Sequence, residues 1–226
     1  MTKFNLLNLY FNSINKYSSN VLFKIPKSKK LKDYSINNSF INSFSNSFDK
    51  LFDEKKDFDI WTYESVDKLT NQYKFLYINN QNKLNPNDRI IYIGNNSPHW
   101  LSANMATYQM NCIFVPIYES QHINVINYII NETKPKIIIC SKNIFKQNIF
   151  NQINPDVLKN ISPSPTFIYL DDINFNNVPE NTDIYNTNSF NTNSSNTNGI
   201  ILYTSGTTGL SKGVCLTHEN IYSNIK

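Results

Sequence analysis

The residues best suited to chemistry lie in one short stretch of the chain, residues 203–214. An apolar, strand-like run at 199–203 leads into a turn rich in hydroxyls and glycine, which carries Lys212, and a second apolar run follows. Backbone N–H groups, hydroxyls and one ammonium close together in sequence are suited to hold phosphate oxygens. The order strand, polar loop, strand, helix therefore predicts an anion-binding loop, with Thr217 as the N-cap of the helix.

The loop differs from two common nucleotide-binding motifs. A P-loop requires Ser or Thr directly after its Gly-Lys pair, whereas here Ser211 precedes Lys212 and Gly213 follows it. The dinucleotide pattern GxGxxG does not occur in the sequence either. Both of these classes are therefore excluded.

Composition and charge are those of a globular protein with a moderately basic surface. The chain has 226 residues, of which 40% are hydrophobic, and a net charge of +4. Asn and Lys are abundant while Arg89 is the single arginine, which we interpret as a bias of base composition. Because the lysines are scattered, we expect no nucleic-acid partner. No apolar run reaches the roughly 18 residues of a membrane span.

The cysteines and histidines predict no metal site. Each cysteine lies in an apolar, strand-like run, and we expect buried thiols in a reducing compartment. The histidines are far apart in sequence and form no recognisable ligand set. The residues concerned are Cys112, Cys140, Cys215, His99, His122 and His218.

Alternating strands and helices predict an α/β fold with a mostly parallel sheet flanked by helices. We expect Ser97 and Pro98 to open one helix, and Ser120 to cap the next. The expected strands cover 60–63, 89–94, 112–118, 136–140, 166–170 and 199–203, and the expected helices cover 40–52, 64–80, 98–110, 120–134 and 143–161.

Two parts of the chain are expected to lie outside this regular pattern. Residues 1–38 are interpreted as a poorly ordered lead-in, and residues from about 172 to 198 as a low-complexity, Asn-rich loop. Within the lead-in, Phe4, Leu7 and Phe11 are spaced to share one face of a short helix with Ile14. Such a helix would be a surface helix or, alternatively, a membrane-contacting or targeting segment.

The loop resembles the phosphate loop of the adenylate-forming (AMP-binding) enzymes, the superfamily of acyl-CoA synthetases, luciferases and peptide-synthetase adenylation domains. Their signature Tyr-Thr-Ser-Gly-Thr-Thr-Gly-x-Pro-Lys-Gly-Val matches residues 203–214, except that Ser211 replaces Pro. Segments 61–66, 87–90 and 95–100 resemble further parts of the family. Val115–Pro116–Ile117–Tyr118 resembles a segment of the long-chain fatty acyl-CoA synthetases in particular.

This resemblance implies a fold and an activity. Residues 39–226 would form an incomplete portion of the large N-terminal domain of the acyl-CoA synthetase/luciferase superfamily, with the C-terminal lid domain absent. The activity implied is that of a long-chain fatty acid–CoA ligase, an ATP- and CoA-dependent enzyme of fatty acid metabolism. It would convert ATP and a fatty acid to acyl-AMP and pyrophosphate, and then form acyl-CoA and AMP. ATP, Mg²⁺ and coenzyme A are the cofactors and substrates implied.

The resemblance also implies roles for individual residues. The ATP phosphate-binding residues would be Thr204, Ser205, Gly206, Thr207, Thr208, Gly209 and Lys212. The family's Thr-Glu motif and catalytic lid lysine lie beyond Lys226, so catalytic residues are unknown and we expect the chain alone to be inactive. No metal ligand is assigned. Residues interpreted as packing rather than contacting substrate are Trp61, Tyr63, Trp100, Pro116 and Tyr118.

Two alternatives to a long-chain ligase stay open. The chain could belong to a ligase for another carboxylate, or it could be a non-catalytic remnant or an Asn-rich interaction module. The partners implied are ATP, fatty acid, coenzyme A and the missing C-terminal part of the same protein. The expected location is the cytoplasm, with peripheral attachment to the endoplasmic reticulum membrane as the alternative.

Overall fold

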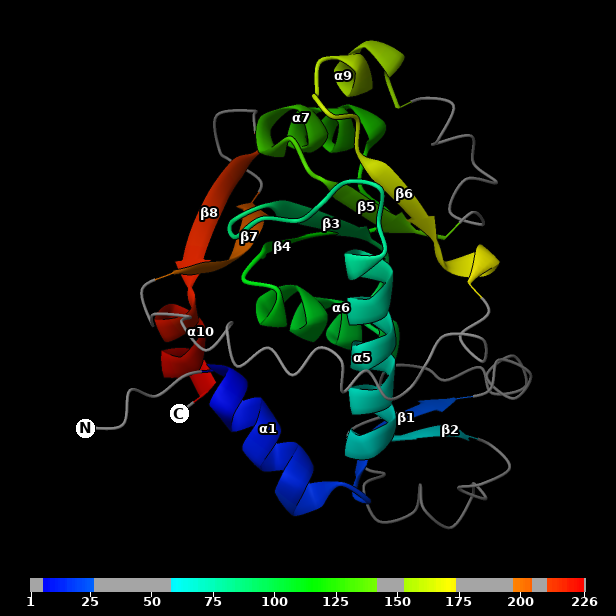
Figure 1. Ribbon diagram of the computed structural model, residues 1–226, viewed down its shortest axis with the longest axis vertical. Coiled ribbons are helices and arrows are strands. Elements are labelled where there is room, and N and C mark those ends of the chain that lie inside the picture. Colours follow the sequence, from blue (N-terminus) through cyan, green and yellow to red (C-terminus); the bar gives the residue numbers. More distant parts are fainter. Residues whose placement is uncertain (1–5, 27–57, 142–152, 174–196, 205–210, 226) are drawn as a thin grey trace, which may run out of the picture.

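The computed structural model describes residues 6–26, 58–141, 153–173, 197–204 and 211–225. These residues form one six-stranded sheet of order β6-β5-β3-β4-β7-β8 and one antiparallel pair, β1 with β2. In the large sheet every neighbouring pair is parallel except β7 with β8. The fold class expected from the sequence, a mostly parallel sheet flanked by helices, is confirmed (Figure 1).

From β2 to β5 the elements follow the predicted order, with small shifts at their ends. The strands are β1 Val21–Pro26, β2 Phe58–Thr62, β3 Arg89–Ile93, β4 Ile113–Ile117, β5 Ile137–Cys140, β6 Thr166–Tyr169, β7 Asn198–Thr204 and β8 Lys212–Thr217. The helices are α1 Leu6–Tyr17, α5 Tyr63–Ile78, α6 Pro98–Gln109, α7 Ile123–Thr133, α9 Pro155–Lys159 and α10 His218–Ile225, with a 3₁₀ turn η3 at Leu170–Asp172.

The core has two layers, one on each face of the large sheet. On one face, Ile90 and Phe114 of the sheet pack with the buried residues of α5 and α6. On the other face, Ile91 and Val115 pack with the buried isoleucines of α7. Both faces of β3, β4 and β5 are therefore buried, which explains why the sequences of these strands are continuously apolar rather than alternating.

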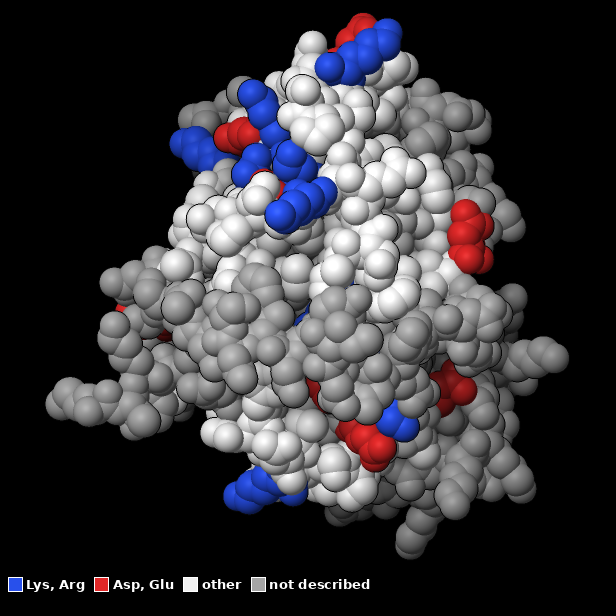
Figure 2. Space-filling model, in the orientation of Figure 1, with Lys and Arg blue, Asp and Glu red and all other residues white. Residues whose placement is uncertain are grey.

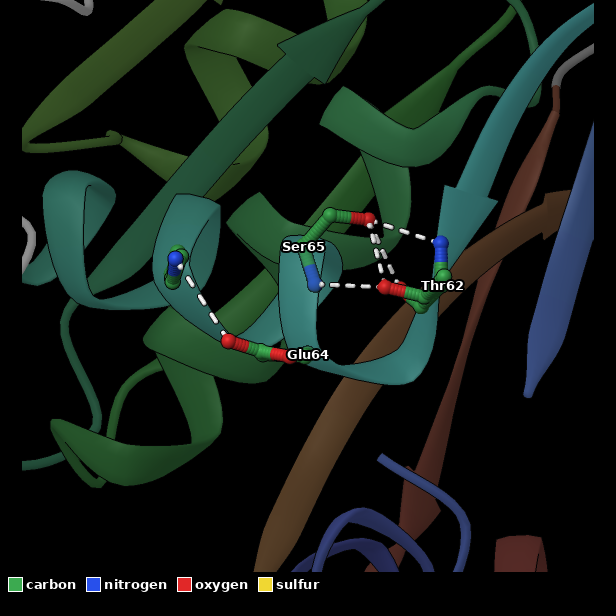
Figure 3. Close-up of polar contacts among 4 residues, drawn as sticks. Thr62, Glu64 and Ser65 are labelled. Carbon is green, nitrogen blue, oxygen red and sulfur yellow. Dashed lines mark hydrogen bonds and ion pairs between the residues drawn. The ribbon is translucent and has the colours of Figure 1, made fainter. Parts of the chain in front are cut away.

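Local capping fixes where the helices begin. Thr62 caps α5 in a reciprocal box: the Ser65 N–H donates to Thr62 Oγ1 at 3.2 Å, and the Thr62 N–H donates to Ser65 Oγ at 2.8 Å (Figure 3). Ser97 caps α6 through the Trp100 N–H, with Pro98 at the first helical position, as predicted. Thr217 likewise accepts from the Asn220 N–H at 3.1 Å and caps α10, as predicted.

Several expectations differ from the structure. The short helix expected within the lead-in is present as α1, but residues 6–26 are not poorly ordered: they also contain β1, and Leu6 and Tyr10 pack against the core, with the Tyr10 hydroxyl 3.0 Å from Thr70 Oγ1. His122, not Ser120, caps α7 by accepting from the Asn124 N–H.

Three further expectations concern the edges of the fold. Cys215 is exposed because it lies on the edge strand β8, whereas Cys112 and Cys140 are buried as expected. Pro155 begins the short helix α9 instead of interrupting a longer one. The expected helix at 40–52 and most of the Asn-rich loop lie outside the described residues.

Helix α10 is joined to the sheet through a buried histidine. The His218 ring is only 2% exposed and meets the Tyr108 ring edge-on, with centroids 4.8 Å apart. A side chain on Gly199 would lie 3.0 Å from His218 Cε1, so the glycine is what lets the ring lie against β7. Burial lowers the pKa of His218, and the neutral ring is therefore the form that fits this site.

The single arginine is used to hold helix α7 at the amino edge of the sheet. Arg89 Nε donates to the Thr133 carbonyl at 2.5 Å, and one terminal nitrogen donates to the Lys134 carbonyl at 3.1 Å. The other terminal nitrogen donates to the Asn87 carbonyl at 3.1 Å. The first two bonds satisfy carbonyls at the C-terminus of α7, where the last carbonyls of a helix have no partner within it. On the face shown in Figure 2, basic side chains gather near α7 and α9.

We expect Arg89→Lys to lower the free energy of unfolding by about 1–3 kcal/mol, because one ammonium cannot reach three carbonyls as the guanidinium does.

We expect Lys134→Gly to raise the free energy of unfolding by about 0.5–1 kcal/mol, since Lys134 has a φ of 45° that glycine adopts without strain. Urea denaturation followed by circular dichroism measures both. Equal stability of Arg89→Lys and the parent chain would contradict the capping role.

Candidate nucleotide-binding loop

The hairpin of β7 and β8 places the two described members of the predicted phosphate loop opposite each other. Thr204 ends β7, Lys212 begins β8, and the two are direct cross-strand partners with exposed side chains. The ammonium and the hydroxyl therefore flank the mouth of the loop. The other predicted site residues, Ser205, Gly206, Thr207, Thr208 and Gly209, lie outside the described residues.

The position of this hairpin follows from how β7 joins the sheet. β7 runs parallel to β4, with Ile200 opposite Phe114. The carboxyl end of β7 therefore lies at the same edge as the carboxyl ends of β3 and β4. The loop starts from this edge, where open α/β sheets bind ligands.

At the same edge, the chain leaves β3 and β4 toward opposite faces of the sheet. β3 leads into α6, which packs on one layer of the core, and β4 leads into α7, which packs on the other (Figure 1). Neighbouring strands that connect to opposite faces leave a crevice between their carboxyl ends. The topology therefore predicts a ligand site next to the hairpin.

A hollow of about 300 Å³ lies at this point. The carboxyl ends of β3, β4 and β7 contribute to its wall, and Ser211 closes it from the β8 side of the loop. The lining residues are Gly94, Asn96, Trp100, Pro116, Ile117, Tyr118, Gln121, Ile129, Leu202, Tyr203 and Ser211.

Most of the residues that line the hollow are not among the site residues predicted from the sequence. Trp100, Pro116 and Tyr118 were interpreted as packing residues, and Trp100 does meet the Phe114 ring edge-on at 5.4 Å. All three nevertheless line the hollow, and the Tyr118 side chain is 63% exposed. The available signal is that Pro116 and Tyr118 lie at the carboxyl end of a predicted parallel strand, and that Trp100 lies in the first turn of the helix after another, where ligand-contacting residues of α/β sheets gather.

Two hydrogen bonds join the loops that leave β3 and β4. The Gly94 N–H donates to the Ile117 carbonyl at 3.0 Å, and the Asn95 side-chain amide donates to a Glu119 carboxylate oxygen. The two loops are therefore held together at the rim beside the hollow.

The charges near the loop are few. The Tyr203 hydroxyl donates to Glu132 Oε2 at 2.7 Å, and burial together with that carboxylate raises the pKa of Tyr203 above its usual value.

Among the described residues, no group of three His, Cys, Asp or Glu side chains is placed to hold a metal ion. Nor does any helix in the described ranges have the length and apolarity to cross a bilayer. The described part of the site thus offers an ammonium, a hydroxyl and an aromatic hollow.

The chain is similar in sequence to a known enzyme family. A family model described as AMP-binding enzyme matches residues 49–226. Fatty acyl-CoA synthetase A of Dictyostelium discoideum is 28% identical over 154 residues, which cover 63% of this chain and 22% of that protein. Long-chain-fatty-acid–CoA ligase 5 of Rattus norvegicus is 27% identical over 145 residues, covering 58% of this chain and 21% of that protein.

A solved structure agrees with these matches at the level of the fold. The fatty acyl-adenylate ligase of L. pneumophila, in complex with acyl adenylate and pyrophosphate, superposes with a TM-score of 0.62 at 19% identity. The superposition covers 98% of this chain and 31% of that one. The chain thus spans about a fifth of the length of these two curated relatives.

Ser211 is the one departure from the motif, and the structure indicates how it can be tested. Ser211 directly precedes the first residue of β8, a position at the start of a strand that proline tolerates. We expect Ser211→Pro to raise the free energy of unfolding by about 0.4–1 kcal/mol through loss of chain entropy in the unfolded state. Urea denaturation measures this. A loss of more than about 1 kcal/mol would mean that the local backbone does not accept proline.

Proposed function

The chain belongs to the AMP-binding enzyme family, and from this membership we propose that the loop between β7 and β8 binds the phosphate groups of ATP. The observation that carries the proposal is the pairing of Thr204 with Lys212 at the mouth of a loop that starts from the carboxyl edge of the sheet. Lys212 would supply a point charge to phosphate oxygens, and the hydroxyls and N–H groups of residues 204–209 would supply hydrogen bonds.

The reaction proposed for the whole protein is adenylation of a carboxylate. A carboxylate oxygen attacks the α-phosphorus of ATP, the bond to the β-phosphate oxygen breaks, and pyrophosphate leaves with its charge. Stabilising that leaving charge is the contribution that Lys212 and the loop hydroxyls would make, since phosphoryl chemistry depends mainly on positioning and electrostatics. In a second step the thiol of coenzyme A attacks the acyl carbonyl and AMP leaves.

The substrate proposed is a long-chain fatty acid. Two features support it: the Val115–Tyr118 segment and the names of the two curated relatives. Mg²⁺ would enter with the ATP phosphates, because hard cations prefer oxygen ligands. We further propose that this stretch of chain binds ATP without completing the reaction alone, since it corresponds to about a fifth of those relatives.

Two alternatives to a long-chain fatty acid ligase stay open, and they differ from it in the acid used or in ATP binding. A ligase for another carboxylate would bind ATP in the same way and differ only in its acid. A non-catalytic remnant or interaction module would not bind ATP at all. For location we propose the cytoplasm, with peripheral attachment to the endoplasmic reticulum membrane as the alternative. The exposed Leu9 and Phe11 side chains of α1 are the apolar groups that such attachment would use.

We expect Lys212→Ala to weaken ATP binding by the chain roughly 10- to 100-fold, because a hydrogen bond to a charged group contributes about 1.5–3 kcal/mol. Titration calorimetry with ATP and Mg²⁺ measures the dissociation constant. Lys159→Ala is the matched control, since Lys159 is an exposed lysine of α9 that pairs only with Asp156 among the described residues.

The proposal would be overturned if Lys212→Ala bound ATP as tightly as the parent chain and the Lys159→Ala control. No ATP binding by the folded parent chain would instead favour a non-catalytic module.

A further inference from the structure

Tyr203, the first residue of the loop motif, contacts two residues outside its own strand, Glu132 of α7 and Gly213 of β8, and the motif explains neither contact. Its hydroxyl reaches Glu132 of α7, 71 positions earlier in the chain, at 2.7 Å. Its ring lies over Gly213, the residue directly after Lys212: a side-chain carbon on Gly213 would approach Tyr203 Cζ to 3.0 Å and the hydroxyl oxygen to 3.2 Å.

These contacts join the two ends of the loop to each other and to a helix. Tyr203 and Gly213 are direct cross-strand partners, one pair inward from Thr204 and Lys212. The ring spans both strands of the hairpin, and the hydroxyl then extends to α7. The hairpin has β4 on one side only, because β8 is the edge strand of the sheet. A contact from α7 is therefore a second anchor for this edge.

Helix α7 presents a small polar and aromatic surface to Tyr203. Tyr128 lies one helical turn before Glu132, and its ring meets the Tyr203 ring edge-on at 6.4 Å. Residues four apart share one face of a helix, so both side chains approach Tyr203 from the same face. Tyr128 restricts the ring while Glu132 binds its hydroxyl.

Glu132 supplies Tyr203 with an acceptor oxygen at 2.7 Å. The hydrogen bond, rather than the charge of the carboxylate, is therefore what we expect to fix the tyrosine.

We propose that Glu132 is a positioning residue for the phosphate loop, acting through Tyr203 and Gly213 to set where Thr204 and Lys212 stand. This inference rests on the proposed function, since the loop is taken to bind ATP. Glu132 itself touches no ligand. Its role is to hold the hairpin against α7, so that Thr204 and Lys212 are in position before ATP arrives and less ordering of these two residues is needed on binding.

The test compares two replacements of the same side chain. Glu132→Ala removes the acceptor, whereas Glu132→Gln keeps an oxygen that can accept from the Tyr203 hydroxyl while removing the charge. We expect Glu132→Ala to weaken ATP binding about two- to tenfold and Glu132→Gln to bind at least as tightly as the parent. Tyr203→Phe should match Glu132→Ala, and the double variant should be no weaker than either. Glu64→Ala is the control, an exposed carboxylate of α5 that pairs with Lys68.

A second measurement does not depend on ATP. Amide hydrogen exchange across the β7–β8 hairpin should accelerate in Glu132→Ala and stay at the parent rate in Glu132→Gln. Unchanged exchange and unchanged ATP affinity in Glu132→Ala would overturn the inference, as would equal weakening by Ala and Gln, which would assign the effect to charge. If the parent chain bound no ATP, the proposed function would fail, while the exchange rates would still decide whether Glu132 positions the hairpin.

Discussion

The parallel pairing of β7 with β4 is the constraint on which the rest of the candidate site depends. It brings the carboxyl end of a strand from the last part of the chain to the edge where β3 and β4 also end. That edge is where the connections to α6 and α7 diverge, so the loop after Thr204 starts beside a crevice that the topology has already opened. Had β7 entered antiparallel to β4, Thr204 would lie at the opposite, amino edge of the sheet, the edge that carries Arg89, and far from this hollow.

Much of the fold could be predicted because its signals are local. Ser97 and Pro98 mark a helix start by their own chemistry, and the dry strands β3, β4 and β5 are visible as continuous apolar runs. Other features depend on contacts that no local pattern contains. His122 is not among the usual capping residues, and α1 is held by Tyr10 against Thr70, 60 positions later.

In the candidate site, too, some features could be predicted from local sequence and others depend on long-range contacts. The motif at 203–214 predicts phosphate binding from residue types alone, and the structure adds that Thr204 and Lys212 are cross-strand partners. The hollow could not be predicted from spacing, because Trp100 lies in α6 and Tyr118 follows β4, and the two meet only through the order of the strands in the sheet. The contact between Tyr203 and Glu132 is likewise invisible in sequence, since it depends on α7 crossing from β4 to β5 over the face on which Tyr203 lies.

We propose that the loop between β7 and β8 is where the phosphates of ATP bind. Amide chemical shifts of the isotopically labelled chain, followed during titration with ATP and Mg²⁺, test this proposal. We expect the largest shifts at Thr204, Lys212 and the residues between them, with little change at the amino edge of the sheet. The largest shifts around Arg89, Lys134 and Lys136, the basic residues at that opposite edge, would contradict it.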